Sequence, residues 1–156
     1  MRDVQSLDSA EATVAAGRRL AAALRAAGLD RATIYLCGDL GAGKTTLARG
    51  FLAGCGHCGR VPSPTYTLVE PYEFDEFTVY HIDLYRLGGA AEVDELGLAD
   101  LDGAGAVLLI EWPERAAGCL PGADLELTFT IEGRGRTLRR DSLSAVGVRL
   151  LERGTG

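Results

Sequence analysis

A short segment that combines glycines with a lysine and a threonine has the residue types needed to hold phosphate. Residues 38–45 read G-D-L-G-A-G-K-T and match the pattern G-x-x-x-x-G-K-[S/T] at every fixed position. Glycines let successive backbone N–H groups point into one tight turn, which forms a nest for phosphate oxygens. A lysine ammonium reaches the terminal phosphates, and the hydroxyl after it is a ligand for magnesium. The segment therefore predicts a P-loop.

The residues on either side of this segment provide the elements that a P-loop requires. Residues 33–37 form an apolar, β-branched run that predicts a buried strand, and residues 44–53 predict a helix that ends at Gly54. A helix that begins at Lys44 adds the positive end of its dipole to the phosphate site. We therefore expect Gly38, Gly43, Lys44 and Thr45 to hold the phosphates and magnesium of a nucleotide.

Composition singles out Lys44. Of the 16 lysine and arginine residues, fifteen are arginine, and Lys44 is the only lysine. A compact ammonium on a flexible stem is the group that the inside of a phosphate-binding loop accommodates. A single lysine in a chain that otherwise uses arginine indicates chemistry that arginine cannot supply.

Two predicted strands end in a carboxylate. Residues 79–83 read V-Y-H-I-D and end in Asp83, whereas residues 107–111 read V-L-L-I-E and end in Glu111. A P-loop site needs such an acid for magnesium or for the attacking water, and ligands gather at the carboxyl ends of parallel strands. At least one of the two is expected to serve the site, and the pattern does not say which.

Three further residues each allow two interpretations. Thr65, in the S-P-T segment 63–65, belongs either to a switch loop that senses the terminal phosphate or to a turn defined by proline. Trp112 follows Glu111 and either packs in the core or shields the reacting phosphate from water. His81 lies inside a predicted strand, where a structural histidine is favoured over a catalytic one.

The whole pattern predicts one α/β domain over residues 1–156, because this length suits a single core. Early alternation of strand and helix predicts parallel strands, and later strand pairs predict an antiparallel addition. We expect a three-layer, P-loop NTPase-like domain with a mixed, mainly parallel sheet. The other expected elements are a lead-in over 1–7, a helix over 8–27 with a capping box at Asp8 and Glu11, strands over 65–69 and 78–82 joined by an acidic turn over 70–76, one or two short helices over 90–102, and strands over 106–110, 124–131, 137–143 and 146–151.

Charge and hydropathy exclude several classes of protein. The net charge is −6, and an acidic domain is a poor stand-alone binder of nucleic acid because phosphate neutralisation needs clustered cations. The one cluster of arginines, over residues 134–140, is expected to be a solvated face of a hairpin. No run of about 18 apolar residues and no secretory pattern occurs. We therefore expect a cytoplasmic protein without membrane contact.

The four cysteines include a pair with metal-like spacing, Cys55 and Cys58, on either side of His57. A structural zinc site normally takes four ligands that arrive in two separated pairs, so we expect no metal at this segment. A redox pair is not favoured either, because the segment does not open a helix after the first strand. In a cytosolic chain the cysteines stay reduced.

The absence of one base-reading motif favours ATP over GTP. Guanine-specific GTPases read the base with N-K-x-D, and this chain contains no asparagine and no second lysine. Three classes of protein remain open on the residues alone. They are an ATPase, a small-molecule P-loop kinase, and a nucleotide-gated binding module whose slow hydrolysis switches its affinity for a partner.

The ordered set of motifs resembles the TsaE family, formerly called YjeE, over nearly the whole chain, from about residue 11 to residue 147. The P-loop is generic, but its combination with S-P-T-Y, H-x-D-x-Y-R and E-W at these intervals is specific. The matching segments are T-x-x-x-G at 13–17, G-D-L-G-A-G-K-T-T at 38–46, V-P-S-P-T-Y at 61–66, H-I-D-L-Y-R at 81–86, E-L-G-L at 95–98 and I-E-W-P-E-R at 110–115.

This resemblance implies roles for individual residues. The phosphates of ATP would be held by Gly41, Ala42, Gly43, Lys44, Thr45 and Thr46. Thr45 would bind Mg²⁺, Glu111 would be the magnesium-linked acid that supports hydrolysis, and Asp83 would be a second acid near the metal. Thr65 would lie in the switch-like loop, and Trp112 would flank the site. Thr13 and Arg136 would approach the nucleotide.

The resemblance also implies partners. Members of the family work with the TsaD–TsaB pair, which transfers a threonylcarbamoyl group to an adenosine of tRNA. ATP hydrolysis by the TsaE component is expected to be weak alone and to support repeated turnover of that pair. Because this chain is acidic, we expect it to meet tRNA only indirectly, through these partners.

Overall fold

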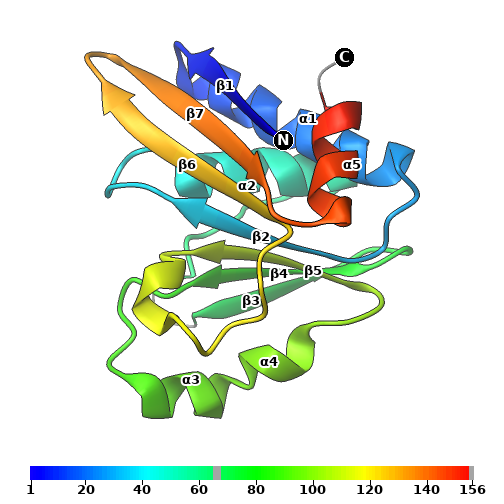
Figure 1. The fold of residues 1–156 in the computed structure, drawn as a ribbon, viewed down its shortest axis with the longest axis vertical. Helices are drawn as coiled ribbons and strands as arrows, with labels where there is room; N and C mark the ends of the chain where they lie inside the picture. Colours follow the sequence, from blue (N-terminus) through cyan, green and yellow to red (C-terminus); the bar gives the residue numbers. More distant parts are fainter. Residues whose placement is uncertain (65–67, 155–156) are drawn as a thin grey trace.

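A mixed sheet forms the centre of the computed structural model, which describes residues 1–64 and 68–154 (Figure 1). The strands of the described part lie in the order β1-β7-β6-β2-β5-β4-β3. Their bounds are β1 Arg2–Leu7, β2 Ala32–Cys37, β3 Val69–Glu73, β4 Thr78–Asp83, β5 Ala106–Glu111, β6 Leu125–Glu132 and β7 Gly135–Ser142. The helices are α1 Ala10–Ala26, α2 Lys44–Cys55, α3 Ala90–Leu96, α4 Leu98–Leu101 and α5 Ala145–Arg153, with a 3₁₀ turn, η1, over Pro113–Ala116.

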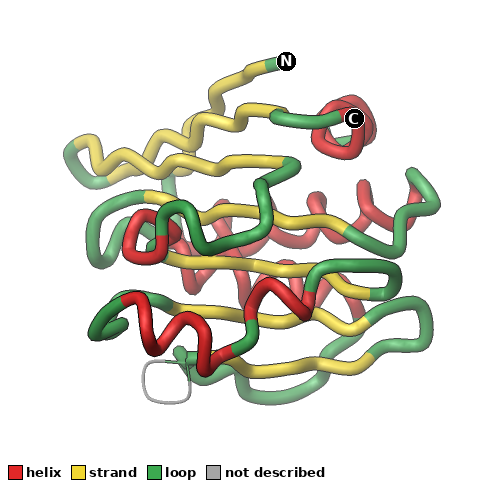
Figure 2. Tube along the Cα trace, turned by 60° about the horizontal axis from the view of Figure 1, so that its bottom comes forward, coloured by secondary structure: helices red, strands yellow, loops and turns green. Residues whose placement is uncertain are grey.

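The centre of the sheet is parallel and its edges are antiparallel. Strands β6, β2, β5 and β4 run in one direction, while β3 pairs antiparallel with β4, and β7 and β1 extend the other side antiparallel. The buried side chains divide into two clusters, one under α1, α2 and α5 and one under α3, α4 and η1. Figure 2 shows α3 and α4 in front of the sheet and the long helices behind it. The predicted three-layer α/β fold with a mixed sheet is thus confirmed.

The unit made of β2, the glycine-rich turn and α2 forms as the sequence predicts. Strand β2 is central and pairs parallel with β5 on one side and β6 on the other. The glycines of the turn adopt φ values of 143° at Gly38, 78° at Gly41 and 117° at Gly43. Residues that carry a Cβ atom rarely adopt these values. Helix α2 begins at Lys44 and ends at Cys55, and its C-cap is Gly56 rather than Gly54 because Gly56 adopts the left-handed conformation.

Helix α1 packs against α2 through backbone as well as side chains. A Cβ atom on Gly17 would lie 2.2 Å from the carbonyl oxygen of Leu47, and one on Gly50 would lie 2.2 Å from that of Val14. The predicted capping box at Asp8 and Glu11 is wrong, because the N-cap of α1 is Ser9, whose side chain accepts from the backbone N–H of Ala12. This cap places the first turn of α1 beside the glycine-rich turn.

Three predicted segments differ in the structure. Residues 2–7 are a strand and not a lead-in, because β1 pairs along its whole length with β7. The predicted acidic turn over 70–76 contains most of β3, an edge strand whose outer side tolerates acidic residues and Pro71. The segment 146–151 is helical, with Ser144 as N-cap and Leu150 and Leu151 buried. Of the predicted strand 65–69, residues 65–67 lie outside the described residues.

Candidate functional site

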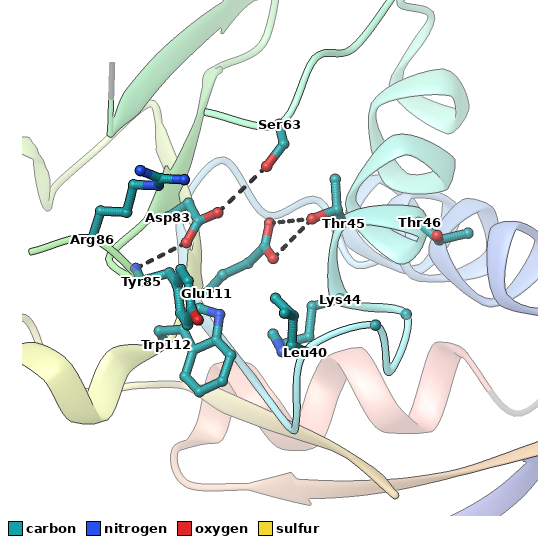
Figure 3. Close-up of a pocket in the computed structure, with 12 residues that line it drawn as sticks. Leu40, Lys44, Thr45, Thr46, Ser63, Asp83, Tyr85, Arg86, Glu111 and Trp112 are labelled. Atoms are coloured by element: carbon teal, nitrogen blue, oxygen red, sulfur yellow. Dashed lines mark hydrogen bonds between the residues drawn. The ribbon is translucent and has the colours of Figure 1, made fainter. Parts of the chain in front are cut away.

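A cavity of about 350 Å³ opens where the glycine-rich turn faces the carboxyl ends of β4 and β5 (Figure 3). Four separate stretches of the chain supply its walls: the turn and first residues of α2, the loop segment at Ser63, the end of β4 with the residues after it, and the end of β5 with the residue after it. Its lining residues are Leu40, Gly41, Gly43, Lys44, Thr45, Thr46, Ser63, Asp83, Tyr85, Arg86, Glu111 and Trp112. The topology therefore brings the motif residues and both predicted acids to one site.

The Lys44 side chain folds back over the turn that precedes it. Its ammonium donates to the carbonyl oxygens of Gly38 and Asp39, the latter at 2.9 Å, and lies 4.2 Å from the centroid of the Trp112 ring. The residue is only 5% exposed. Burial lowers the pKa of Lys44, while the negative charges of Glu111 and Asp83 oppose that shift. These contacts hold the ammonium against the glycine-rich turn.

Glu111 is the acid that contacts the P-loop helix directly. The Thr45 hydroxyl lies 2.9 Å from Oε1 and 3.0 Å from Oε2 of Glu111, and the carboxylate is almost fully buried at 2% exposure. Oε2 also lies 2.6 Å from Nε2 of His81. In Figure 3 the Glu111 carboxylate lies between Thr45 and Asp83. A hydroxyl and a carboxylate at this separation are oxygen donors of the kind that Mg²⁺ prefers.

Asp83 lies on the neighbouring strand and directly opposite Glu111 in the parallel register. Its Oδ1 accepts from the backbone N–H of Tyr85 at 3.0 Å, and its Oδ2 lies 3.4 Å from the Ser63 hydroxyl. Burial raises the pKa of Asp83, and the nearby charge of Glu111 acts in the same direction, while the Tyr85 N–H opposes both. Asp83 and Glu111 thus form a pair of acids at adjacent strand ends.

Trp112 lines the cavity and also packs against the smaller core cluster, whereas its role in shielding a phosphate from water stays a prediction. Its backbone adopts a φ of 58°, which is uncommon for a bulky residue and turns the chain sharply after Glu111. The indole lies 5.0 Å from the Tyr85 ring, and the Arg115 guanidinium lies over both rings. The indole therefore forms an aromatic wall beside Lys44.

A second, smaller cavity of about 190 Å³ lies on the other side of the glycine-rich turn and shares Gly41, Gly43 and Thr46 with the first. Helix α1 and strand β7 close it. Arg136 of β7 donates to the carbonyl oxygen of Gly41 at 3.3 Å. The remaining lining residues are Leu7, Ser9, Ala10, Thr13, Ala42, Arg134 and Arg136. Thr13 and Arg136, 123 residues apart in the sequence, thus meet at the turn.

The four arginines of the predicted hairpin face have divided roles. Arg134 and Arg136 line the second cavity, whereas Arg139 pairs with Asp141 and Arg140 pairs with Asp3. These ion pairs neutralise two of the four cations. The arrangement is therefore not the clustered basic surface that nucleic acid requires.

The predicted site residues of the described chain line one or both cavities, except Gly38, which contributes through its carbonyl contact with Lys44. Thr65 lies outside the described residues. The sequence did not single out the contact between His81 and Glu111, although one signal was available, since His81 stands two residues before Asp83 on the same face of β4.

Cysteine and histidine side chains do not form a metal centre in the described part of the chain. Within residues 1–64 and 68–154, no group of three or more His, Cys, Asp and Glu residues is placed to hold a metal ion. Burial raises the pKa of the Cys55 thiol to about 11, and Cys58 is exposed. A magnesium site does not need such a group, because Mg²⁺ is typically held by one or two carboxylates together with phosphates and water.

Comparison with known proteins assigns the family. The family model described as threonylcarbamoyl adenosine biosynthesis protein TsaE matches residues 7–140. The chain belongs to the TsaE family. Two relatives are each named tRNA threonylcarbamoyladenosine biosynthesis protein TsaE, and they differ in sequence identity and in the share of each chain that is matched. The one from Haemophilus influenzae is 53% identical over 59% of this chain and 58% of its own length, and the one from Bacillus subtilis is 37% identical over 74% of this chain and 71% of its own.

A solved structure supports the fold assignment of this TsaE-family chain. The crystal structure of YdiB from Bacillus subtilis matches 99% of this chain and 95% of its own, with a TM-score of 0.75 and 26% identity. The described part of the chain contains no helix long and apolar enough to cross a membrane. The chain thus has a P-loop NTPase-like fold and belongs to a family named for tRNA modification.

Proposed function

We propose that the protein is the ATPase component of tRNA threonylcarbamoyladenosine biosynthesis, which binds ATP with Mg²⁺ and supports turnover of the TsaD–TsaB transferase. One observation carries the enzymatic part of this proposal. The hydroxyl of Thr45, at the start of α2, donates to the buried carboxylate of Glu111 at the end of β5. That pair, beside Lys44, has the composition of a magnesium-nucleotide site.

The phosphates are assigned to the turn and the first residues of α2. The segment from Gly41 to Thr46 would supply backbone N–H groups to the phosphate oxygens, and the N-terminus of α2 favours negative charge. Lys44 would exchange its contacts with the carbonyl oxygens of Gly38 and Asp39 for the β- and γ-phosphate oxygens of ATP. The Lys44 ammonium already lies against the glycine-rich turn, so binding of ATP would require it only to exchange its hydrogen-bond acceptors.

Magnesium is assigned to oxygen ligands on two sides of the cavity. Thr45 would supply its hydroxyl, and Glu111 and Asp83 would hold the ion directly or through water. The ion would neutralise charge on the β- and γ-phosphates during transfer. Glu111 would also orient the attacking water, which forms a bond to the γ-phosphorus as the bond to the β–γ bridging oxygen breaks. Trp112 would limit the access of other water, and Thr65 is assigned to the loop that senses the γ-phosphate.

The second cavity is assigned to the rest of the nucleotide. It lies on the far side of the same turn, and Thr13 and Arg136 border it. ATP is preferred to GTP in this proposal because the chain contains no asparagine for an N-K-x-D motif. The arginine at position 136 would approach the sugar or the phosphates, which its contact with the Gly41 carbonyl supports.

The partners are assigned from the family. TsaD–TsaB would bind this protein in an ATP-dependent manner and carry out the transfer to tRNA, so that the protein meets tRNA indirectly and in the cytoplasm. The net charge of −6 and the ion-paired arginines of β7 support this division of labour. We expect the isolated protein to be weakly active because a partner would complete or order the site.

The decisive experiment is a phosphate-release assay on the purified protein, alone and with a TsaD–TsaB pair. We expect slow hydrolysis alone, stimulation by the pair, and loss of both in Lys44→Ala. Glu111→Ala should bind ATP but not hydrolyse it. The matched control is Glu126→Ala, which removes a carboxylate from β6 outside the nucleotide cavity and should keep the wild-type rate.

Three outcomes would change the proposal. Normal hydrolysis by Glu111→Ala would keep the ATPase assignment and transfer the role given to Glu111 to Asp83. Absence of stimulation, with the γ-phosphate found on a small metabolite, would identify a small-molecule kinase. Nucleotide-dependent binding of the pair without any hydrolysis would identify a nucleotide-gated binding module.

A further inference from the structure

His81 contributes a contact that the P-loop motif does not account for. The imidazole is 0% exposed, and its Nε2 lies 2.6 Å from Oε2 of Glu111. A buried histidine against a buried carboxylate is costly to assemble unless their polar atoms are matched. The pair also lies directly beside the Thr45 hydroxyl, which contacts the same carboxylate.

The sheet register places His81 underneath the site and not in it. In the parallel pairing of β4 with β5, His81 lies opposite Leu109 and Asp83 lies opposite Glu111. Because side chains alternate along a strand, His81 and Asp83 share the face that carries Glu111. His81 therefore reaches Glu111 diagonally from one step deeper in the sheet, and it does not line the cavity.

The pattern of donors and acceptors assigns the imidazole proton. An ionised carboxylate only accepts hydrogen bonds, so Nε2 of His81 must donate to Glu111. Nδ1 is buried and has no partner among the described residues. If the neutral ring carries its proton on Nε2, only the lone pair of Nδ1 lacks a partner. If it carries the proton on Nδ1, a buried N–H lacks a partner and the lone pair of Nε2 faces the Glu111 carboxylate, which is also an acceptor.

We propose that His81 is the positioning residue of Glu111: its Nε2–H holds one carboxylate oxygen, so that the carboxylate stays oriented toward Thr45 and the magnesium position. This inference rests on the proposed ATPase function. Without His81, Thr45 would be the remaining side-chain donor to Glu111 in the described part of the chain. The carboxylate would then rotate more freely, and loss of such a supporting contact typically costs on the order of 10–100-fold in activity or metal affinity.

The kinetic test compares two substitutions that differ in one donor. His81→Gln keeps an N–H group at nearly the reach of Nε2, whereas His81→Met fills similar space without a donor. We expect kcat for ATP hydrolysis to fall on the order of 10–100-fold in His81→Met, with KM for ATP changed less than about threefold. His81→Gln should recover most of kcat.

A control variant separates positioning from packing. Val79 lies two residues before His81 on the same face of β4 and is fully buried, but it belongs to the apolar core. Val79→Ala should lower the thermal midpoint and leave kcat within about twofold. A folded His81→Met with wild-type kcat would overturn the proposal, and so would a His81→Gln as impaired as His81→Met or a Val79→Ala with the same loss of kcat.

A second readout does not depend on hydrolysis. The chain contains two histidines, so the imidazole signals in side-chain ¹⁵N spectra come only from His57 and His81. We expect His81 to carry its proton on Nε2 and not on Nδ1, and Glu111→Ala to weaken this preference while leaving the His57 signals unchanged. A proton on Nδ1 of His81 in the wild-type protein would overturn the inference. If the wild-type protein hydrolyses no ATP, the ATPase proposal fails and the tautomer measurement still decides the role of His81.

Discussion

Glu111 is the residue at which most interactions of the site meet. It accepts from Thr45, contacts His81, and lies opposite Asp83 in the sheet. The sequence predicts where Lys44 and Thr45 lie in the site, because the P-loop motif is local and its spacing sets the geometry. It does not distinguish the roles of Asp83 and Glu111, or reveal the contact of His81, because both depend on which strands pair and in what register.

We expect Asp83→Asn to stabilise the fold while weakening hydrolysis. The amide oxygen can still accept from the Tyr85 N–H, but the buried charge is removed. Burial raises the pKa of Asp83 above its ordinary value of 3.8, so between these two values the folded protein holds more protons than the unfolded chain. Wild-type stability therefore falls as pH rises through that interval, whereas the variant lacks this loss.

Urea unfolding at a series of pH values in metal-free buffer measures this difference. The difference in stability should be smallest below pH 3.8 and grow in favour of Asp83→Asn toward neutral pH. Magnesium-dependent ATP hydrolysis should fall at least about tenfold. A variant less stable than the wild type at neutral pH would contradict the prediction, since it would mean that the Asp83 charge is stabilised in the fold.

At the scale of elements, the close contact between α1 and α2 positions the walls of the second cavity, because α1 carries Thr13 and α2 carries Thr46. The sequence predicts both helices from their apolar spacing. It does not predict β1, β3 or the helical nature of α5, because β1 and β3 are polar edge strands stabilised by pairing, and the short apolar run 146–151 fits either periodicity. Tertiary pairing decides these elements.

We expect Gly50→Ala to destabilise the protein by about 1–3 kcal/mol. A Cβ atom at this position would lie 2.2 Å from the carbonyl oxygen of Val14, so the two helices would have to move apart. Gly54→Ala is the matched control, since its Cβ would meet Arg18 and Ala21 no closer than 3.0 Å. Thermal and urea unfolding should rank Gly54→Ala clearly closer to the wild type. Equal stabilities of the two variants would refute the close backbone contact.

At the scale of the whole molecule, the glycine-rich turn joins segments from both ends of the chain. Thr13 of α1 and Arg136 of β7 border one cavity, and the ends of β4 and β5 border the other. The sequence predicts the α/β class and the mixed character of the sheet from the alternation of elements. It does not predict the order of strands, which places β7 next to β6 and β1 at the edge, because that order depends on contacts between residues far apart in the chain.

Because these segments belong to one sheet and its helices, we expect nucleotide binding to stabilise the entire fold. At a free ATP–Mg²⁺ concentration of about 100 times Kd, the free energy of unfolding should rise by about 2.7 kcal/mol. For a domain of this size, that gain raises the thermal midpoint by roughly 5–10 °C. A calorimetric or fluorescence melt with a non-hydrolysable ATP analogue measures the shift.

The controls for this shift remove the ligand's contacts one at a time. Lys44→Ala should abolish it, chelation of Mg²⁺ should reduce it, and Arg139→Gln, which removes a cation paired with Asp141 away from both cavities, should retain it. A shift of equal size in Lys44→Ala would place the nucleotide elsewhere on the protein.

The single lysine described above also makes this chain unusually simple to modify chemically. Lys44 is the only side chain with a primary amine, and burial lowers the pKa of that amine, so a larger share of it is unprotonated and nucleophilic. An acylating reagent therefore has two amine targets in the chain, the N-terminus and the P-loop. Because each acylation adds a known mass to the intact protein and the N-terminus accounts for one addition, loss of the second addition would report that the P-loop is occupied, with no need to map peptides.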